Sequence, residues 1–225
     1  MSGHDPLTIN IVTIFPGFFE TPLATSIPGR AAEAGLVRYR VVDLRSFTSD
    51  RHQTVDDTPY GGGAGMVLKP EPFFDAVDSL APQGPVVLLS ARGKTFSHDD
   101  AVRYAVQPDL TLLCGHYKDV DQRVADHVAT EEISLGRFVL SGGEIGALAV
   151  ADSVVRLLPG VLGDHDSAAT DSFYAGASLS APSYTRPADY RGYAVPEVLR
   201  GGDHRQIEEW REAEAIRRTA EQEGE

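Results

Sequence analysis

The stretch ISLGRFVLSGGEIGALAVADSVVRLLPGVLG, residues 133–163, decides the fold that this sequence predicts. We expect 138–140 to end a buried strand and 141–143 to form a tight turn of small residues. The pattern then predicts a helix over 144–158, which the Pro-Gly pair at 159–160 ends. Because this helix is apolar almost all round, we expect it to be buried. A glycine turn between a strand and a helix lets a ligand approach the backbone closely, although it fits a close-packed connection without a ligand equally well.

Two strands earlier in the chain are expected to end in similar turns. One covers 86–89 and precedes Ser-Ala-Arg-Gly at 90–93, and the other covers 110–114 and precedes Gly-His-Tyr at 115–117. The helices expected after the three strands cover 98–106, 119–127 and 144–158. Strands that alternate with helices predict an α/β fold with a parallel sheet, in which ligands bind at the carboxyl ends of the strands. The three turns would gather at that edge.

The first eighty residues contain one long polar loop among regular elements. The elements expected here are strands over 7–15 and 38–44 and helices over 18–36 and 70–80. The first of these helices should be interrupted at 28–29, where Pro and Gly follow each other. The loop over 46–65 is too long and too charged for a simple connection, which indicates a functional role.

Beyond residue 163 the apolar periodicity weakens, which predicts a separate organisation for the rest of the chain. We expect one domain over 1–163, a flexible linker or lid over 164–181, and a small helical domain over 182–225. The last helix is expected over 204–221.

Composition is that of a globular protein and says little about a partner. Cys114 is the only cysteine among the 225 residues, so no internal disulfide forms and a reducing compartment fits. The net charge of −13 argues only weakly against a nucleic-acid partner, because local arginine clusters bind phosphate even on an acidic protein. The sequence has neither a signal-peptide pattern nor an uninterrupted apolar run of about 18 residues, so we expect a cytoplasmic protein without a membrane partner.

General motifs leave the function open. The glycine-rich run at 61–65 follows no predicted strand and lacks the Lys-Ser/Thr pair of a P-loop. The sequence contains no Rossmann fingerprint, no cysteine-rich zinc pattern, no His-Glu-x-x-His and no Gly-x-Ser-x-Gly elbow.

The combination of short motifs is more specific than any one of them. In chain order these are Asp-Arg-His at 50–52, Thr-Val-Asp-Asp at 54–57, Pro-Tyr-Gly-Gly-Gly at 59–63, Ser-Gly-Gly-Glu at 141–144, Pro-Gly-Val-Leu-Gly at 159–163, Thr-Asp-Ser-Phe at 170–173 and Tyr-Thr-Arg-Pro at 184–187. This series closely resembles the bacterial tRNA (guanine-N1)-methyltransferase family TrmD, of the SPOUT superfamily. The resemblance extends roughly from Ile9 to Arg211.

The resemblance implies a fold and an activity that periodicity alone does not predict. The fold would be a parallel-sheet SPOUT domain with a deep trefoil knot towards its C-terminal side, followed by a small, mainly α-helical C-terminal domain. Knots are nearly absent from other proteins. The methyl donor would be S-adenosylmethionine, the acceptor N1 of the guanosine at position 37 of tRNA, and the enzyme a homodimer.

Two residues match the catalytic positions of the family. Asp171 would be the general base that removes the N1 proton, and Arg156 would stabilise the negative charge that this removal places on guanine O6. Alternatively, Asp171 is a helix cap or surface residue, and Arg156 forms an i,i+4 pair with Asp152.

The donor site implied by the resemblance is rich in backbone groups and glycines. Its candidate residues are Leu89, Ser90, Gly115, Tyr117, Ser134, Leu135, Gly136, Arg137, Phe138, Val139, Leu140, Gly142 and Gly143. The alternative interpretation is that these residues form ordinary core and turn structure and bind no ligand.

Residues from three parts of the chain are candidates for contact with tRNA. They are Arg51, His52, Asp56, Lys118, Ser167, Arg186 and His204. Taken singly, each of these residues is equally consistent with a solvated surface position that contacts no RNA.

The turn after the strand at 110–114 departs from the family pattern. It reads Gly-His-Tyr-Lys-Asp, with Lys118 where many relatives carry glutamate. A lysine reverses the charge there and weakens any claim of bound magnesium, so we assign no metal site and the magnesium requirement stays open. Two rival interpretations remain: a knotted methyltransferase that acts on another RNA base, and an inactive RNA-binding module of the same fold.

Overall fold

The computed structural model describes residues 5–162, 171–174 and 178–223. The chain divides into two compact units, over 1–163 and 164–225, and we describe each by itself. No helix within the described residues is both long and apolar enough to cross a membrane.

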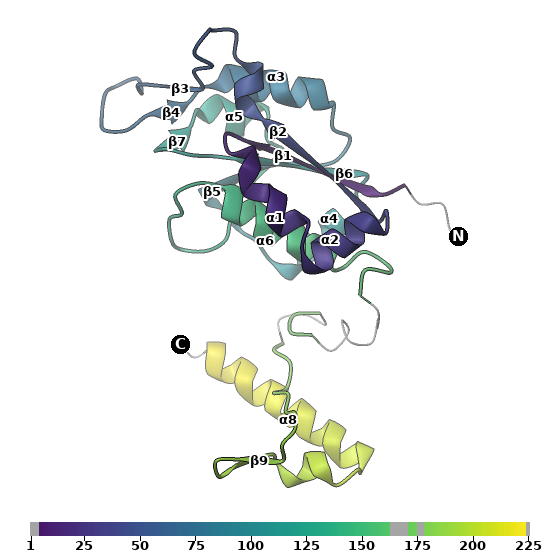
Figure 1. The fold of residues 1–225 in the computed structure, drawn as a ribbon. Coiled ribbons are helices and arrows are strands. Elements are labelled where there is room, and N and C mark those ends of the chain that lie inside the picture. The colour runs from purple at the N-terminus through teal and green to yellow at the C-terminus, as the bar shows by residue number, and fades with distance from the viewer. Residues whose placement is uncertain (1–4, 163–170, 175–177, 224–225) are drawn as a thin grey trace. The chain divides into compact units, whose positions relative to one another are not determined.

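The first unit is built on a five-stranded sheet in the order β2-β1-β6-β5-β8, and every neighbouring pair is parallel (Figure 1). The strands are β1 (Leu7–Thr13), β2 (Val37–Asp43), β5 (Val86–Thr95), β6 (Asp109–Cys114) and β8 (Glu131–Ser134). The central residues of β1 and β6 are mostly apolar and buried, as expected when helices cover both faces of a parallel sheet, whereas the edge strand β2 exposes Arg38 and Arg40. The predicted parallel α/β fold is therefore confirmed.

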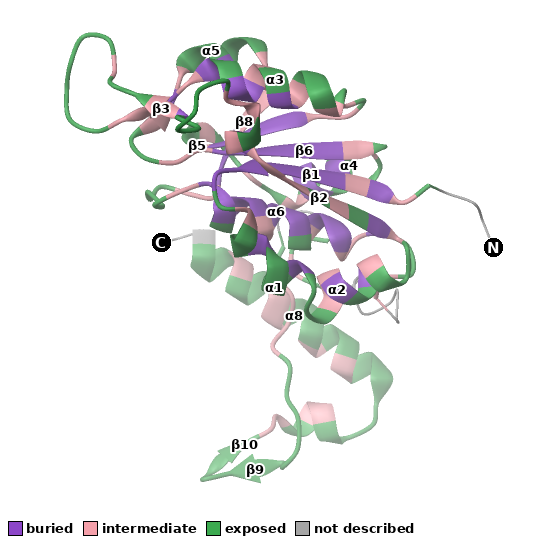
Figure 2. Cartoon of the chain, turned by 45° about the horizontal axis from the view of Figure 1, so that its top comes forward, coloured by how far each residue is buried: buried purple, intermediate pink, exposed green. Residues whose placement is uncertain are grey.

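Helices cover both faces of this sheet and form two separate apolar cores (Figure 2). One face packs against α1 (Glu20–Leu23), α2 (Ser26–Glu33), α4 (His98–Ala105) and α6 (Glu144–Val155). The other face packs against α3 (Pro70–Leu80) and α5 (Gln122–His127). Two 3-10 helices, η1 (Pro16–Phe19) and η2 (Leu44–Phe47), follow β1 and β2. The predicted helices over 70–80, 98–106 and 144–158 are confirmed within a few residues.

The prediction that 138–140 end a buried strand is wrong. The strand β8 already ends at Ser134, and the next residues leave the sheet through Gly136, whose φ is +154°. Phe138 and Val139 are 55% and 86% exposed. These apolar side chains line a cavity instead of a core, and hydrophobicity along the sequence does not distinguish the two.

Two other expected boundaries and one expected burial differ from the structure. The helical break lies at 24–25 instead of 28–29, because Pro28 sits in the first turn of α2, where a missing N–H costs no helical hydrogen bond. The expected helix over 119–127 begins only at Gln122, after Asp121 caps it by accepting a hydrogen bond from the Arg123 amide. The helix α6 is buried on most sides but not all round, since Ile145 and Asp152 are exposed.

The strand β5 continues past the turn predicted at 90–93. Both Leu89 and Lys94 pair with Ile133, so 90–93 form an excursion after which the strand rejoins β8. Gly93 permits the return, because a Cβ there would overlap the backbone of Ile133.

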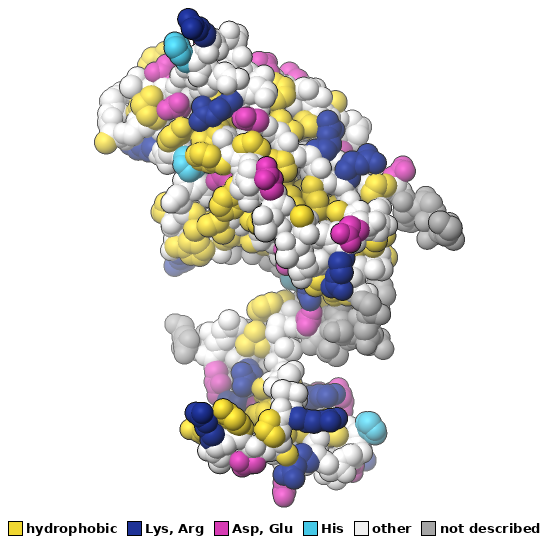
Figure 3. All heavy atoms as spheres, in the orientation of Figure 1, with side chains coloured by type: hydrophobic (Ala, Val, Ile, Leu, Met, Phe, Trp, Pro, Cys, Tyr) yellow, Lys and Arg dark blue, Asp and Glu magenta, His cyan; other side chains and the backbone are white. Residues whose placement is uncertain are grey.

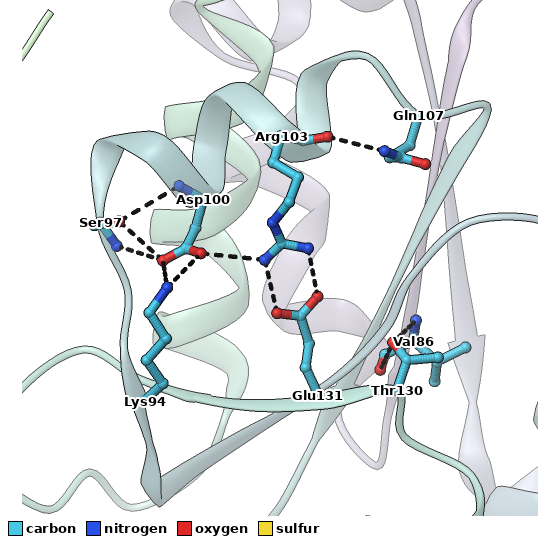
Figure 4. A network of polar contacts seen from close by, with 8 residues as sticks. All are labelled: Val86, Lys94, Ser97, Asp100, Arg103, Gln107, Thr130 and Glu131. Atoms are coloured by element: carbon cyan, nitrogen blue, oxygen red, sulfur yellow. Dashed lines mark hydrogen bonds and ion pairs between the residues drawn. The ribbon is translucent and has the colours of Figure 1, made fainter.

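A network of charges holds the strand where it returns (Figure 4). Lys94 Nζ lies 2.9 Å from Asp100 Oδ1, and Arg103 donates to both Asp100 and Glu131 at 3.1 and 2.7 Å. Ser97 and Asp100 also form a capping box at the start of α4. Burial alone would raise the pKa of Asp100, but the hydrogen bonds from Lys94, Arg103 and Ser97 outweigh it and lower this pKa to about 2.

A small second sheet attaches the long polar loop to the turn after β6. Its strands lie in the order β3 (Asp56–Asp57), β4 (Val67–Leu68) and β7 (Asp119–Val120). The β4 and β7 strands are parallel, and the Lys118 amide donates to the Met66 carbonyl at 3.1 Å. The glycine-rich end of the loop is thereby held beside Lys118.

The second unit contains a hairpin and a long helix. The antiparallel strands β9 (Asp189–Tyr190) and β10 (Tyr193–Ala194) precede η3 (Glu197–Arg200) and α8 (His204–Glu223). Trp210 packs against Tyr184 with 6.3 Å between ring centroids, and the Leu179 amide donates to Thr219 Oγ1 on the same helix. The division into a linker over 164–181 and a domain over 182–225 stays a prediction.

Candidate active site

A cavity of about 260 Å³ opens at the carboxyl ends of β5, β6 and β8. Three segments form its walls: 88–92 at the β5 excursion, 115–120 after β6, and residues within 133–143 after β8. Its volume lies just below the range of about 300–1,000 Å³ that is typical of small-molecule sites. The predicted meeting of the three turns at one edge of the sheet is therefore confirmed.

Glycines allow the second and third walls to approach closely. The Gly143 amide donates to the Gly115 carbonyl at 2.8 Å, and His116 and Gly142 form an isolated antiparallel bridge. A Cβ on Gly143 would lie only 2.8 Å from Cys114 Cα, and one on Gly142 would overlap Glu144 Oε2. The two glycines are thus needed where the chain returns beside β6.

Thr13, Glu144 and His116 form a series of polar contacts next to this bridge. Thr13 Oγ1, at the end of β1, donates to Glu144 Oε1 at 2.8 Å, and His116 Nδ1 lies 3.9 Å from Glu144 Oε2. The His116 ring also packs against Phe15, with 4.9 Å between the ring centroids. Burial raises the pKa of the nearby Cys114 thiol well above its ordinary value, and the Glu144 charge raises it further. Cys114 is therefore an inert core thiol.

The rim of the cavity carries a tight ion pair. Arg92 donates to both carboxylate oxygens of Asp119, at 2.7 and 3.1 Å, and this pair connects the first wall to the second. Lys118, between Tyr117 and Asp119, also lines the cavity. Tyr117 has a left-handed φ of +60°, which reverses the chain direction before Lys118.

Eleven of the thirteen residues predicted for the donor site line the cavity. They are Leu89, Ser90, Gly115, Tyr117, Ser134, Leu135, Phe138, Val139, Leu140, Gly142 and Gly143. Gly136 and Arg137 belong to the same segment but are not among the lining residues. Whether these residues bind a methyl donor stays a prediction.

The sequence-based prediction missed several lining residues. They are Leu88, Ala91, Arg92, His116, Asp119, Val120, Ile133, Ser141 and Gly146. Most belong to the same three turns as the predicted residues, so position directly after a strand was a usable signal. The pairing of Arg92 with Asp119 had no such signal, because the two lie 27 positions apart.

The two catalytic candidates lie in different units. Arg156 caps the C-terminal end of α6 in the first unit, where it is half-buried. Asp171 is exposed in the second unit, and its carbonyl accepts a hydrogen bond from the Tyr174 amide. Their catalytic roles stay predictions.

The candidates for tRNA contact are distributed over both units. Arg51 and His52 are exposed neighbours in the long polar loop, and Asp56 lies in β3. Lys118 belongs to the cavity wall, while Arg186 and His204 are exposed in the second unit. Ser167 lies outside the described residues. None of these placements tests contact with RNA.

Comparison with known proteins identifies the family. The family model described as tRNA (Guanine-1)-methyltransferase TrmD matches residues 7–225. The chain belongs to the TrmD family. It is 50% identical to a tRNA (guanine-N(1)-)-methyltransferase of Geobacillus kaustophilus over 216 residues, which are 95% of this chain and 88% of that protein. It is 49% identical to the protein of the same name from Bacillus subtilis over 217 residues, 95% of this chain and 89% of that protein.

Membership of the TrmD family confirms the resemblance drawn from the ordered motifs, and it makes the chain an enzyme of the methyltransferase class. Within the described ranges, no group of three or more His, Cys, Asp or Glu side chains is arranged to hold a metal ion.

Proposed function

We propose that this protein transfers a methyl group from S-adenosylmethionine to N1 of the guanosine at position 37 of tRNA. The observation that carries the proposal is the cavity at the carboxyl ends of β5, β6 and β8, in a chain that belongs to the TrmD family. The relatives' names support the acceptor base, and the motif resemblance supports the position in tRNA.

The lining of the cavity fits a nucleoside-containing donor. Gly115, Gly142 and Gly143 line it without side chains, and Leu89, Leu135 and Leu140 supply apolar surface for the faces of an adenine ring. When bound, S-adenosylmethionine supplies an electrophilic methyl group on its sulfonium. The protein's own contribution is to hold the reacting groups in line and exclude water.

Asp171 and Arg156 supply the acid–base chemistry in this proposal. Guanine N1 carries a proton at neutral pH and is a poor nucleophile until the proton leaves. The Asp171 carboxylate accepts that proton, and the resulting negative charge moves onto O6. The Arg156 guanidinium stabilises this charge through fixed N–H donors.

We also propose the knot and the homodimer of the SPOUT superfamily. The close return of Gly142 and Gly143 beside Gly115 and His116 supports a threaded backbone at the cavity. Exposed apolar side chains near this point support a subunit interface, among them Phe15, Phe18, Val139 and Ile145. Figure 3 shows hydrophobic side chains gathered on one face of the larger unit.

Contacts to tRNA would come from both units in this proposal. Arg51 and His52 in the polar loop, and Arg186 and His204 in the second unit, offer exposed groups for phosphate. Because the net charge is −13, we expect binding to depend on such local groups instead of the overall field. An enzyme that modifies tRNA in this way would work in the cytoplasm.

The test is a single-turnover methylation assay with an unmodified tRNA transcript that carries guanosine at position 37. We expect a primer-extension stop one nucleotide beyond that position, and no product with a transcript that carries adenosine there. Asp171→Asn should lower the rate about 100-fold or more and leave S-adenosylhomocysteine affinity within about threefold. Asp75→Asn, which removes an exposed carboxylate from α3, is the matched control and should keep the full rate.

Three results would contradict the proposal in different ways. A stop at another position indicates a methyltransferase for another base. Equal, negligible rates for the wild type and Asp171→Asn, with retained tRNA binding, indicate an RNA-binding module. If the Asp171→Asn variant keeps full activity, Asp171 is not the general base. Repeating the wild-type reaction with a magnesium chelator tests the metal requirement.

A further inference from the structure

The most informative feature outside the proposed catalytic pair is the isolated positive charge of Lys118 in the cavity wall. The side chain of Lys118 makes no hydrogen bond or ion pair with any residue in the part of the chain that the structure describes. The other charged lining residues are differently placed: Arg92 and Asp119 neutralise each other at 2.7 Å. Among the described lining residues, Lys118 therefore carries a positive charge that no neighbour neutralises.

The glycine-rich loop determines where this cation lies. A Cβ built on Gly65 would lie 3.1 Å from Lys118 Cβ and 3.5 Å from its Cδ, and one built on Gly63 would lie 3.5 Å from Nζ. The lysine stem therefore runs along the backbone at 63–65. Both glycines have positive φ, +115° and +93°, so the loop has the shape that accepts this stem.

The ion pair between Arg92 and Asp119 leaves the charge of Lys118 without a neutralising carboxylate. Asp119 directly follows Lys118 and is the only carboxylate among the described residues that line the cavity. Because Arg92 occupies both of its oxygens, Asp119 is not available to neutralise the Lys118 ammonium. In the part of the lining that the structure describes, apolar surface is thus combined with one lysine whose charge is not neutralised.

We infer that Lys118 binds the carboxylate of the methyl donor's amino-acid end and so fixes the orientation of the donor. This inference rests on the proposed function, because it assumes that S-adenosylmethionine occupies the cavity. The donor has one anionic group, its carboxylate, and the positively charged sulfonium would be repelled from the same ammonium. A phosphate of the tRNA is the other anion of the proposed reaction, and the experiment distinguishes it.

The test compares two ligands that differ only in the carboxylate: S-adenosylhomocysteine and its decarboxylated analogue. Isothermal titration of the full chain should show that Lys118→Met lowers S-adenosylhomocysteine affinity about fivefold at low salt, since the group is exposed and partly screened. Affinity for the decarboxylated analogue should stay unchanged. Lys118→Arg should retain part of the preference, and Lys69→Met, which removes the same charge outside the cavity, should leave both affinities unchanged.

Each contrary result has its own meaning. If Lys118→Met weakens both ligands equally or neither, Lys118 does not bind the carboxylate. If it weakens only tRNA binding, measured separately by filter binding, the anion is a phosphate and the inference is overturned. If the wild type binds neither adenosyl ligand, the proposed function itself fails. If the wild type binds both ligands with equal affinity, only the inference about Lys118 fails.

Discussion

Replacing Gly143 with alanine adds a single methyl group where the second and third cavity walls meet. Gly143 has φ of −75° and ψ of −9°, a conformation that alanine adopts freely, so any effect is steric. The new Cβ would lie 2.8 Å from Cys114 Cα, 3.0 Å from the Gly115 nitrogen and 3.1 Å from Leu89 Cβ. Two of these three atoms belong to the backbone and cannot move alone.

Relief of these contacts requires the third wall to separate from β6, which lengthens the 2.8 Å hydrogen bond from Gly143 to Gly115. Overpacking of this kind costs about 1–3 kcal/mol. Most of the cost falls on the cavity, because α6 keeps its own hydrogen bonds and core contacts. We therefore expect Gly143→Ala to lower S-adenosylhomocysteine affinity at least about tenfold, which corresponds to about 1.4 kcal/mol.

Isothermal titration measures this affinity, and urea unfolding measures any global loss of stability. Gly201→Ala is the matched control: its φ is −78°, and its Cβ would meet only carbonyl oxygens at 3.8 Å. It should bind the ligand like the wild type. Wild-type affinity in Gly143→Ala would refute the reasoning, since the two walls would then not need their close approach.

Two further predictions concern the charged groups. Asp100→Asn should destabilise the protein by about 2 kcal/mol at pH 7, because the Asp100 pKa falls from 3.8 to about 2 on folding. This stabilisation is present above pH 4 and is lost as pH falls through about 2. Urea unfolding should therefore show a smaller difference in stability between the variant and the wild type at pH 2.5 than at pH 7. An equal difference at both pH values would contradict the ionic origin of the stabilisation. Arg156→Ala should lower the single-turnover methylation rate about 100-fold and change tRNA affinity less than about threefold, whereas a loss confined to affinity would indicate a role in binding.

The sequence by itself determined the fold class and the family. Continuous apolar strands that alternate with helices predicted the parallel sheet, because this periodicity is local and follows from which faces are buried. The ordered motifs from Asp50 to Tyr184 predicted the TrmD family, which the comparisons confirmed. The family resemblance supplied most of the residues that line the cavity, and position after a strand predicted that the three turns meet at one edge of the sheet.

Only the tertiary structure decided how the walls are made. The apolar run at 138–140 predicts a strand on hydrophobicity alone, yet it lines a cavity, because a ligand-sized hollow needs apolar surface as much as a core does. The Arg92–Asp119 pair and the path of Lys118 along Gly63 and Gly65 join segments far apart in the chain. Such contacts depend on backbone angles at turns and on where strands rejoin the sheet, and local sequence patterns do not determine either.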